Sequence, residues 1–164
     1  MAEIALCRVD TRLLHGQIVT RWKQQLNLTK CIIVDNELPK NDLLSQIYVS
    51  AAPADMKVKI YDEAKAIRIW NKNQFAEGRV LLLLNNIEGC LTLAEGGVDI
   101  KAVQLGGLPG APGRVMVAKS VQVNKEELEV LRKLRDRGIE VYAQMTPENE
   151  RVGFDAIERK VTQS

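Results

Sequence analysis

The single histidine of this 164-residue chain, His15, lies in a stretch rich in groups that bind anions. Residues 8–22 read RVDTRLLHGQIVTRW, with Arg12 three positions before the histidine and Gly16 directly after it. An apolar, strand-like run ends near Val9, and a helical pattern begins near Gly16. The unpaired amides and the dipole at the start of such a helix favour a phosphate group. The imidazole would then stand beside a phosphorus atom that it could attack.

Each residue of this loop has an expected part in such a site. The backbone of Leu13, Leu14, Gly16 and Gln17 would line the phosphate, and Gly16 would remove a side chain that could crowd it. Arg12 would donate a fork of hydrogen bonds to the same group. Positive charge from Arg12 and the helix end should disfavour the imidazolium, which leaves a neutral nitrogen for attack.

A second interpretation of the same residues carries equal weight at this point. A lone histidine often starts a helix as a hydrogen-bonded polar residue without a chemical role. Arg12 could pair with Asp10 alone, and Trp22 is typical of a core residue. Residue types and spacing therefore leave both interpretations open.

Short apolar, β-branched runs alternate with helical patterns along the chain. The runs predict strands over residues 4–9, 31–35, 58–61, 79–84, 100–105 and 139–143. Apolar side chains at helical spacing predict three helical faces, formed by Ile18, Val19, Trp22 and Leu26, by Leu43, Leu44 and Ile47, and by Ala64, Ile67 and Trp70. A fourth helix is expected over residues 87–94, ended by Gly96 and Gly97. A fifth helix is expected to begin at a capping box formed by Asn124 and Glu127 and to end at Gly138, with Leu128, Leu131 and Leu134 facing inward.

Nearly continuous apolar strands indicate a parallel sheet that is buried on both faces. We predict a single α/β domain over residues 1–164, an open, mostly parallel, doubly wound sheet with helices on both faces and an antiparallel edge strand or hairpin. The antiparallel part is expected within residues 106–123, where glycines and prolines precede alternating apolar residues. Ligands of such folds bind beyond the carboxyl ends of the strands. This edge would bring together Asp10, Arg12, His15, Asp35, Asn85 and Gly106.

Composition and missing motifs argue against several functions. The chain has 23 basic and 21 acidic residues, a net charge of +2 and 4% aromatic residues, which disfavours nucleic acid as a partner. Neither a G-x-G-x-x-G motif after the first strand nor a P-loop motif supports a nucleotide cofactor, and no G-x-S-x-G elbow supports a serine triad. Cys7, Cys31 and Cys90 are expected as small core residues, so neither metal nor cofactor is predicted. No apolar run fits a signal peptide or a membrane span, which predicts a cytoplasmic protein.

The stretch RVDTRLLHGQIVTRW closely resembles the segment around the phosphorylated histidine in one family of phosphate carriers. These are the IIB components of the mannose, fructose, sorbose and N-acetylgalactosamine type of the phosphoenolpyruvate-dependent sugar phosphotransferase system. The pattern R-[IV]-D-x-R-L-[IL]-H-G-Q after a first strand combines several rare choices in ten residues. Residues 32–42, 93–107 and 131–144 also look like later segments of that family.

The resemblance implies a sugar phosphotransferase that carries phosphate covalently. His15 would accept a phosphoryl group on Nδ1 from the phosphohistidine of a IIA component and pass it to the 6-hydroxyl of a sugar held by the membrane subunits IIC and IID. Arg12 and the loop amides would stabilise the transferred group without a metal, and Asp10 would orient Arg12 or the imidazole. Gly106 and Gly107 would form the facing wall. The chain would be cytoplasmic and peripherally associated with the transporter, without inserting into the membrane; the sugar and the oligomeric state, a homo-oligomer included, stay open.

One loop departs from the family pattern. Members often follow the glycine pair with methionine and then histidine or an aromatic residue, whereas residues 108–113 here read LPGAPG. Two other functions fit the same chemistry. One is a regulatory domain that binds a phosphorylated small molecule without a covalent bond. The other is a phosphohistidine phosphatase or mutase, although Leu14 stands where those enzymes usually have the arginine of Arg-His-Gly.

Overall fold

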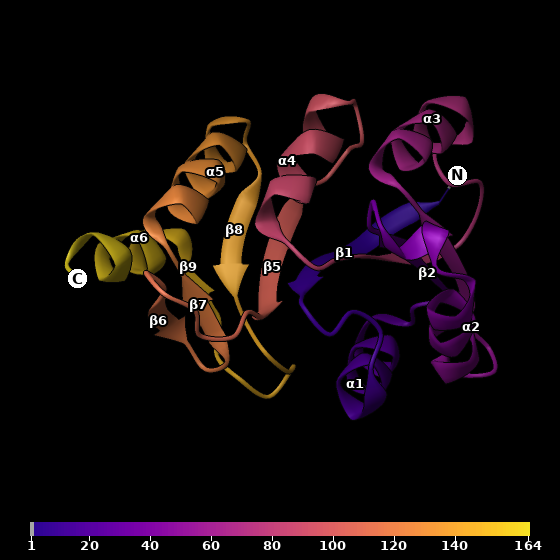
Figure 1. Cartoon of the computed structure of the whole chain (residues 1–164), viewed down its shortest axis with the longest axis horizontal. Coiled ribbons are helices and arrows are strands. Elements are labelled where there is room, and N and C mark those ends of the chain that lie inside the picture. Colours follow the sequence, from indigo (N-terminus) through magenta and orange to yellow (C-terminus); the bar gives the residue numbers. More distant parts are fainter. Residues whose placement is uncertain (1) are drawn as a thin grey trace.

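The computed structural model describes residues 2–164, with the backbone alone for residues 17 and 18. Its helices are α1 (Gly16–Leu26), the short 3-10 turn η1 (Leu38–Lys40), α2 (Asp42–Ala51), α3 (Glu63–Asn73), α4 (Ile87–Glu95), α5 (Lys125–Asp136) and α6 (Phe154–Thr162). Its strands are β1 (Glu3–Asp10), β2 (Lys30–Val34), β3 (Lys57–Tyr61), β4 (Arg79–Leu84), β5 (Ala102–Gly107), β6 (Val115–Ala118), β7 (Val121–Val123), β8 (Glu140–Ala143) and β9 (Val152–Gly153). Each strand and helix predicted from the sequence is present (Figure 1).

The main sheet has the strand order β3-β2-β4-β1-β5-β8-β9. The pairings among β3, β2, β4, β1, β5 and β8 are all parallel, and only the two-residue β9 runs antiparallel at the edge. Strands β6 and β7 form a separate antiparallel hairpin within the segment where the sequence predicted one. The predicted fold class is therefore confirmed, with the hairpin in the predicted segment, whereas the edge strand β9 lies outside it and was not predicted.

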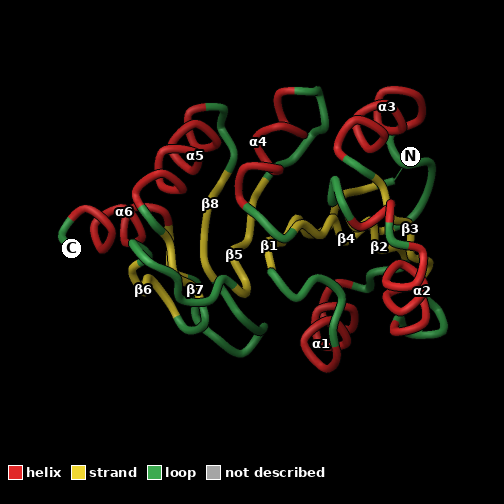
Figure 2. The backbone as a smooth tube through the Cα atoms, in the orientation of Figure 1, coloured by secondary structure: helices red, strands yellow, loops and turns green. Residues whose placement is uncertain are grey.

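Helices cover both faces of the sheet, and strand alternation assigns the apolar side chains to one face or the other. In β4, for example, Leu82 and Leu84 belong to the core under α3, α4 and α5, whereas Leu81 and Leu83 belong to the core under α1. Figure 2 shows α3, α4 and α5 on one side of the strands and α1 and α2 on the other. This arrangement is the doubly wound packing expected of buried parallel strands.

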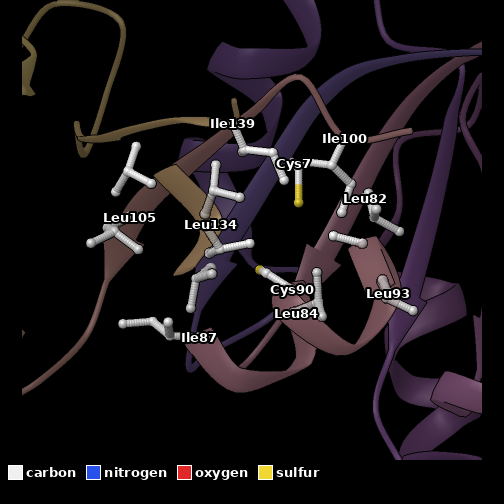
Figure 3. Close-up of a cluster of buried hydrophobic side chains, with 14 of the residues drawn as sticks. Cys7, Leu82, Leu84, Ile87, Cys90, Leu93, Ile100, Leu105, Leu134 and Ile139 are labelled. Atoms are coloured by element: carbon white, nitrogen blue, oxygen red, sulfur yellow. The ribbon is translucent and has the colours of Figure 1, made fainter. Parts of the chain in front are cut away.

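The three cysteines are free and buried, which confirms the prediction that they are core residues. Cys7 and Cys90 face each other in the larger core, among the leucines of β4, α4 and α5 (Figure 3). Cys31 lies in the smaller core on the other face, where burial raises the pKa of its thiol. All three side chains therefore contribute to packing.

Local sequence signals placed the helix ends correctly. Asn124 and Glu127 form the predicted capping box at the start of α5. Gly97 after α4 and Gly138 after α5 both adopt the left-handed conformation, with φ of 103° and 85°. In α1, Val19 and Trp22 are buried as expected, while the side chain of Ile18 lies outside the described residues.

Helix α2 differs from the expectation in one respect. Leu43, Leu44 and Ile47 were predicted to form a face like those of the other helices, yet all three are exposed. Tyr48 instead packs against the core under α1, and Ser45 donates to the Leu38 carbonyl. The hydrophobic periodicity correctly predicted the helix, but it did not indicate which side would be covered.

Within residues 2–164, no helix combines the length and the apolar character needed to cross a lipid bilayer.

Candidate functional site

The candidate site lies at the carboxyl end of β1, where the connections of the sheet diverge. From β1 the chain passes through α1 to β2 on one side, and the later crossover through α4 enters β5 on the other side. Such a switch point leaves a crevice between neighbouring strand ends. The β1 end carries Asp10, and its neighbour on β5 is Gly107.

A tight loop connects β1 to α1. Leu13 has a left-handed backbone, with φ of 56°, and its amide donates to the Asp10 carbonyl. The side chains of Leu13 and Leu14 are buried in the core under α1, which anchors the loop. Leu13 therefore shapes the turn, and its amide is already occupied, contrary to the expectation that it lines a phosphate.

His15 precedes the first residue of α1 and has an extended backbone, but its side chain does not cap the helix. Its Nε2 lies 3.0 Å from Asp10 Oδ2, and 22% of the side chain is exposed. An ionised carboxylate only accepts hydrogen bonds, so the proton between them belongs to Nε2. In the neutral ring this tautomer leaves the lone pair on Nδ1.

Asp10 is fully buried and stays ionised. Burial raises its pKa, but hydrogen bonds from the His15 ring and from the Arg12 amide and guanidinium, together with the charge of Arg8, lower the pKa to about 2. One oxygen, Oδ2, accepts from His15 and Arg8, and the other, Oδ1, accepts from the Arg12 amide at 3.0 Å. The imidazole therefore lies beside a carboxylate as well as near cations. The sequence predicted only positive surroundings, from Arg12 and the helix end.

Arg12 lies at the solvent edge of the site. Its Nε is 3.3 Å from Asp10 Oδ1, and 51% of its side chain is exposed. The weak geometry, with a second contact of 3.4 Å from Nη2 to Oδ2, leaves most of the guanidinium fork available. Arg12 can therefore keep one contact with Asp10 and still bind an anion at His15.

At the start of α1, several amides lack a hydrogen-bond acceptor in the part of the chain that the structure describes. Within the described residues, the amides of Leu14 and His15 have no acceptor, and Gly16 begins a helix whose first amides lack intrahelical partners. Gly16 has φ of 34°, and a Cβ built on it would meet no atom within 4 Å. Gln17, whose backbone was also predicted to line the phosphate, is the second residue of α1, so its amide is another of these first helical amides.

Sequence reasoning missed Arg8, which is buried beneath the site. Its Nη1 donates to Gln104 Oε1 at 2.5 Å and to the Gln144 carbonyl at 3.2 Å, and Nη2 donates to Asp10 at 3.2 Å. Burial lowers the pKa of Arg8, and the charge of Asp10 opposes that effect. A charged residue inside an apolar strand was the available signal, because such a residue needs a buried partner.

The glycine pair of β5 makes room for these side chains. A Cβ on Gly106 would clash with the Arg8 guanidinium, and a Cβ on Gly107 would lie 2.7 Å from Asp10 Oδ1. Gly107 also accepts a hydrogen bond from the Thr11 amide. Both glycines therefore allow Arg8 and Asp10 to lie against the β5 backbone, and Gly107 also lines the cavity beside Arg12.

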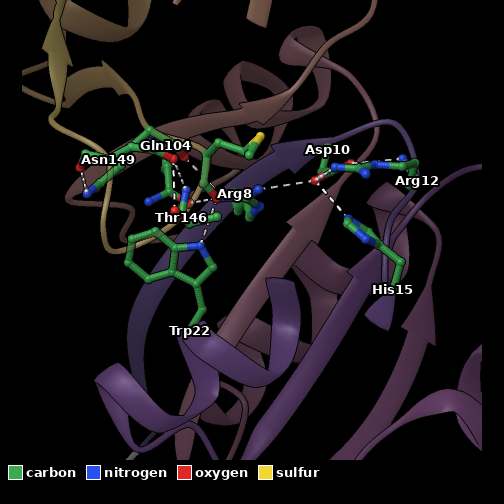
Figure 4. A network of polar contacts seen from close by, with 10 residues as sticks. Arg8, Asp10, Arg12, His15, Trp22, Gln104, Thr146 and Asn149 are labelled. Atoms are coloured by element: carbon green, nitrogen blue, oxygen red, sulfur yellow. Dashed lines mark hydrogen bonds and ion pairs between the residues drawn. The ribbon is translucent and has the colours of Figure 1, made fainter. Parts of the chain in front are cut away.

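A wider polar network continues from Arg8 to the loop after β8 (Figure 4). The Gln144 amide donates to the Asn149 carbonyl, and Trp22 of α1 donates to the Met145 carbonyl at 3.1 Å. Trp22 is thus a core residue, as expected, which also ties α1 to this loop. Gln104 Nε2 and Gln144 Oε1 are buried without a hydrogen-bond partner among the described residues.

Two residues expected at the same rim have local roles instead. Asp35 accepts from the amides of Glu37 and Leu38 and closes the turn after β2. Asn85 accepts from the side chain of Asn86, the cap of α4. In the described part of the chain, neither residue has a hydrogen bond to Asp10, Arg12 or His15, and no cluster of three His, Cys, Asp or Glu side chains could hold a metal ion.

A cavity of about 350 Å³ opens beside Arg12, between the loop after β1 and the segment after β5. Its lining residues are Thr11, Arg12, Gly107, Leu108, Pro109 and Ser120. Two hydroxyls and the Arg12 guanidinium therefore border this cavity. The divergent loop over residues 108–113 contributes its first two residues to this wall.

Comparisons with known proteins agree on one family. The sequence model described as "PTS system sorbose subfamily IIB component" matches residues 4–164. The mannose-specific EIIAB component of Escherichia coli K12 is 36% identical over 138 residues, which are 84% of this chain and 43% of that protein. The sorbose-specific EIIB component of Lacticaseibacillus casei is 33% identical over 84% of each chain. The chain thus spans less than half of the longer EIIAB relative.

Solved structures give the same result. The IIBSor domain of the sorbose permease from Klebsiella pneumoniae superposes with a TM-score of 0.89, at 27% identity over 96% of this chain and 97% of that chain. A protein described as manxB from Thermoanaerobacter tengcongensis superposes with a TM-score of 0.91, at 32% identity over 98% and 97% of the two chains.

Proposed function

Because the chain belongs to the sorbose subfamily of IIB components of the sugar phosphotransferase system, we propose that His15 is its phosphorylated residue. His15 takes a phosphoryl group from the phosphohistidine of a IIA component and passes it to the 6-hydroxyl of a sugar held by the membrane subunits IIC and IID. IIB components in general are phosphotransferases that work with other components of the system, and some relatives are fused IIAB chains. Its place of action would be the cytoplasmic side of that transporter.

The observation that carries this proposal is the contact between His15 Nε2 and Asp10. With the proton held on Nε2, the free lone pair of Nδ1 attacks the phosphorus, and the electron pair of the breaking P–N bond returns to the donor histidine. Phosphorylation of Nδ1 places positive charge on a ring that keeps its Nε2 proton. The ionised, buried Asp10 stabilises that charge.

The phosphoryl group itself is bound by groups at the loop. Transfer passes through a transition state with charge on the equatorial oxygens, so catalysis consists of positioning and charge stabilisation. Arg12 and the amides of Leu14, His15 and Gly16 belong to the same short loop as His15 and would donate to the phosphoryl oxygens. In the second step the sugar hydroxyl attacks phosphorus, the electron pair of the breaking P–N bond returns to Nδ1 of His15, and the hydroxyl proton passes to solvent. The cavity beside Arg12 offers hydroxyls and a guanidinium for the sugar.

The direct test is phosphorylation from phosphoenolpyruvate through enzyme I, the histidine carrier protein and the cognate IIA. We expect one acid-labile, alkali-stable phosphate per chain, because His15 is the only histidine. His15→Ala should take up none; label on this variant would overturn the proposal. Absence of label on the unmodified chain would instead favour a domain that binds phosphate without a covalent bond. Rapid release of free phosphate would favour a phosphatase.

Arg12→Ala serves as the second variant in this experiment. Arg12 is half exposed and belongs to neither core, so the variant should stay folded. Loss of one preorganised donor slows such reactions by roughly 100-fold or more. Transfer at the unmodified rate would remove Arg12 from the site.

A further inference from the structure

Helix α2 presents an apolar strip to solvent. Leu43, Leu44 and Ile47 are 71%, 39% and 54% exposed, and no other segment of the described chain covers them. The single charged residue of the helix is Asp42 at its start. Residues three and four positions apart are neighbours on a helix surface, so these side chains form one continuous strip across two turns. Scattered exposed apolar residues are ordinary, whereas a continuous strip indicates an interaction site.

The strip adjoins the phosphorylation loop. Tyr48 follows Leu44 by one turn of α2 and faces the core, and its hydroxyl donates to the Arg12 carbonyl at 3.3 Å. Tyr48 also packs against the core that holds Leu13 and Leu14. Figure 1 shows α1 and α2 on the same side of the sheet. The helix that carries the strip therefore lies directly against the loop that carries His15.

We propose that the α2 strip is the docking surface for the phosphoryl-donor protein, which would place apolar side chains against it. This inference rests on the proposed function of His15. During transfer, one phosphorus atom must be within reach of both histidines, so the surface around the donor histidine lies on the surface around His15. The donor phosphate is an anion, and the half-exposed Arg12 next to the strip supplies the complementary charge.

The chemistry of the strip argues against other occupants. A helix that lies on an anionic membrane carries several lysines or arginines, and α2 has none. A stable dimer of this chain would bury about 800 Å² on each copy, far more than three side chains provide. A small apolar contact suits a partner that must bind and leave in each cycle. The sugar is better matched by the cavity lined by Arg12 and two hydroxyls, to which no residue of the strip contributes.

The test replaces the strip with polar residues of good helix propensity, in the double variant Leu43→Gln/Ile47→Gln. With cognate phospho-IIA as donor, the second-order rate constant for labelling of His15 should fall about tenfold or more, while the rate at saturating donor stays unchanged. Phosphoramidate, a small donor that needs no docking surface, should label both proteins equally. The matched control is Met116→Gln, which changes a 61% exposed apolar residue on β6 and should keep the unmodified rate constant.

The outcomes separate this inference from the proposed function. If the unmodified chain takes label from phospho-IIA and the double variant does so equally fast, the inference fails and the function of His15 stands. A parallel loss with phosphoramidate would place the defect in the site itself and overturn the inference. The inference would also be overturned if the double variant were defective only in transfer from the phosphorylated protein to sugar in transporter membranes. It would likewise be overturned if the unmodified chain formed a dimer and the double variant were a monomer. If the unmodified chain takes no label, both proposals fail.

Discussion

The two faces of the central strands β1, β5 and β8 differ in chemistry although both are buried. The face under α4 and α5 is wholly apolar, with Val9, Leu105 and Val141 among its strand residues. The opposite face, reached by the alternate residues of the same strands, carries Arg8, Asp10, Gln104, Tyr142 and Gln144, each at most 8% exposed. Burial of hydrocarbon stabilises the fold, whereas burial of polar groups costs free energy unless every group finds a partner.

The polar face is the part of the core that lowers the stability of the fold. Arg8 and Asp10 are paired, but Gln104 and Gln144 each keep one buried polar atom without a partner in the described structure. An incompletely satisfied network is less stable than an apolar one of the same shape. The polar face is therefore explained by the site that it supports, because it fixes the carboxylate that holds His15.

The largest effect on stability is expected from Arg8→Met. The variant removes one partner of a buried ion pair and leaves Asp10 with fewer cations, which should lower the free energy of unfolding by about 3–5 kcal/mol. Labelling of His15 by phospho-IIA should also slow, because Asp10 loses a hydrogen bond that orients it. Urea unfolding and a labelling time course measure the two effects. The second variant Arg8→Met/Asp10→Asn should recover part of the stability and none of the labelling rate.

Leu134→Ala on the apolar face provides the comparison for Arg8→Met. Leu134 is fully buried between α5 and the sheet, so its truncation should cost about 2–5 kcal/mol of unfolding free energy. The folded fraction should nevertheless be labelled at the unmodified rate. If Leu134→Ala slowed labelling as much as Arg8→Met, the two faces would not differ in function.

The next effect concerns the pH dependence of stability. The pKa of Asp10 is lowered from an ordinary 3.8 to about 2 in the folded chain. A carboxyl with a lowered folded pKa stabilises the fold fully above its unfolded pKa, and this contribution disappears as the pH falls through the folded pKa. Between pH 4 and pH 2, the unmodified chain should therefore lose about 2 kcal/mol more than Asp10→Asn. Urea unfolding at several pH values gives the free energy of unfolding against pH for the unmodified chain and for Asp10→Asn. Equal slopes for the two proteins would show that Asp10 is not held ionised.

The sequence predicted the strands and helix ends well because those signals are local. The capping box of Asn124 and Glu127 and the apolar run of β4 each lie within a few neighbouring residues. The switch-point rule then correctly placed Asp10, Arg12 and His15 together, because they share one strand end and one loop. The two-residue β9 was too short to show a pattern.

Other features depend on contacts that a local pattern does not contain. Arg8 meets Gln104 and Gln144 across 96 and 136 positions of sequence, so its anchoring role appears only once β1, β5 and the end of β8 are adjacent. The exposed face of α2 was missed for a related reason. Periodicity shows that Leu43 and Ile47 share a side, but a neighbour must be known before that side is assigned to the core.

Gly107→Ala should have the smallest effect on stability. It tests most directly whether the polar face serves phosphoryl transfer while the apolar face serves stability. The new Cβ would lie 2.7 Å from Asp10 Oδ1, so the carboxylate must shift from its place between Arg8 and His15. Such overpacking should cost about 1–2 kcal/mol of unfolding free energy, whereas the labelling rate should fall because His15 loses its fixed orientation. Gly153→Ala, whose Cβ would meet no atom within 4 Å, is the matched control and should change labelling little. If Gly107→Ala lost stability but kept the unmodified labelling rate, Asp10 would be a structural partner of Arg8 alone, and the polar face would have no part in phosphoryl transfer.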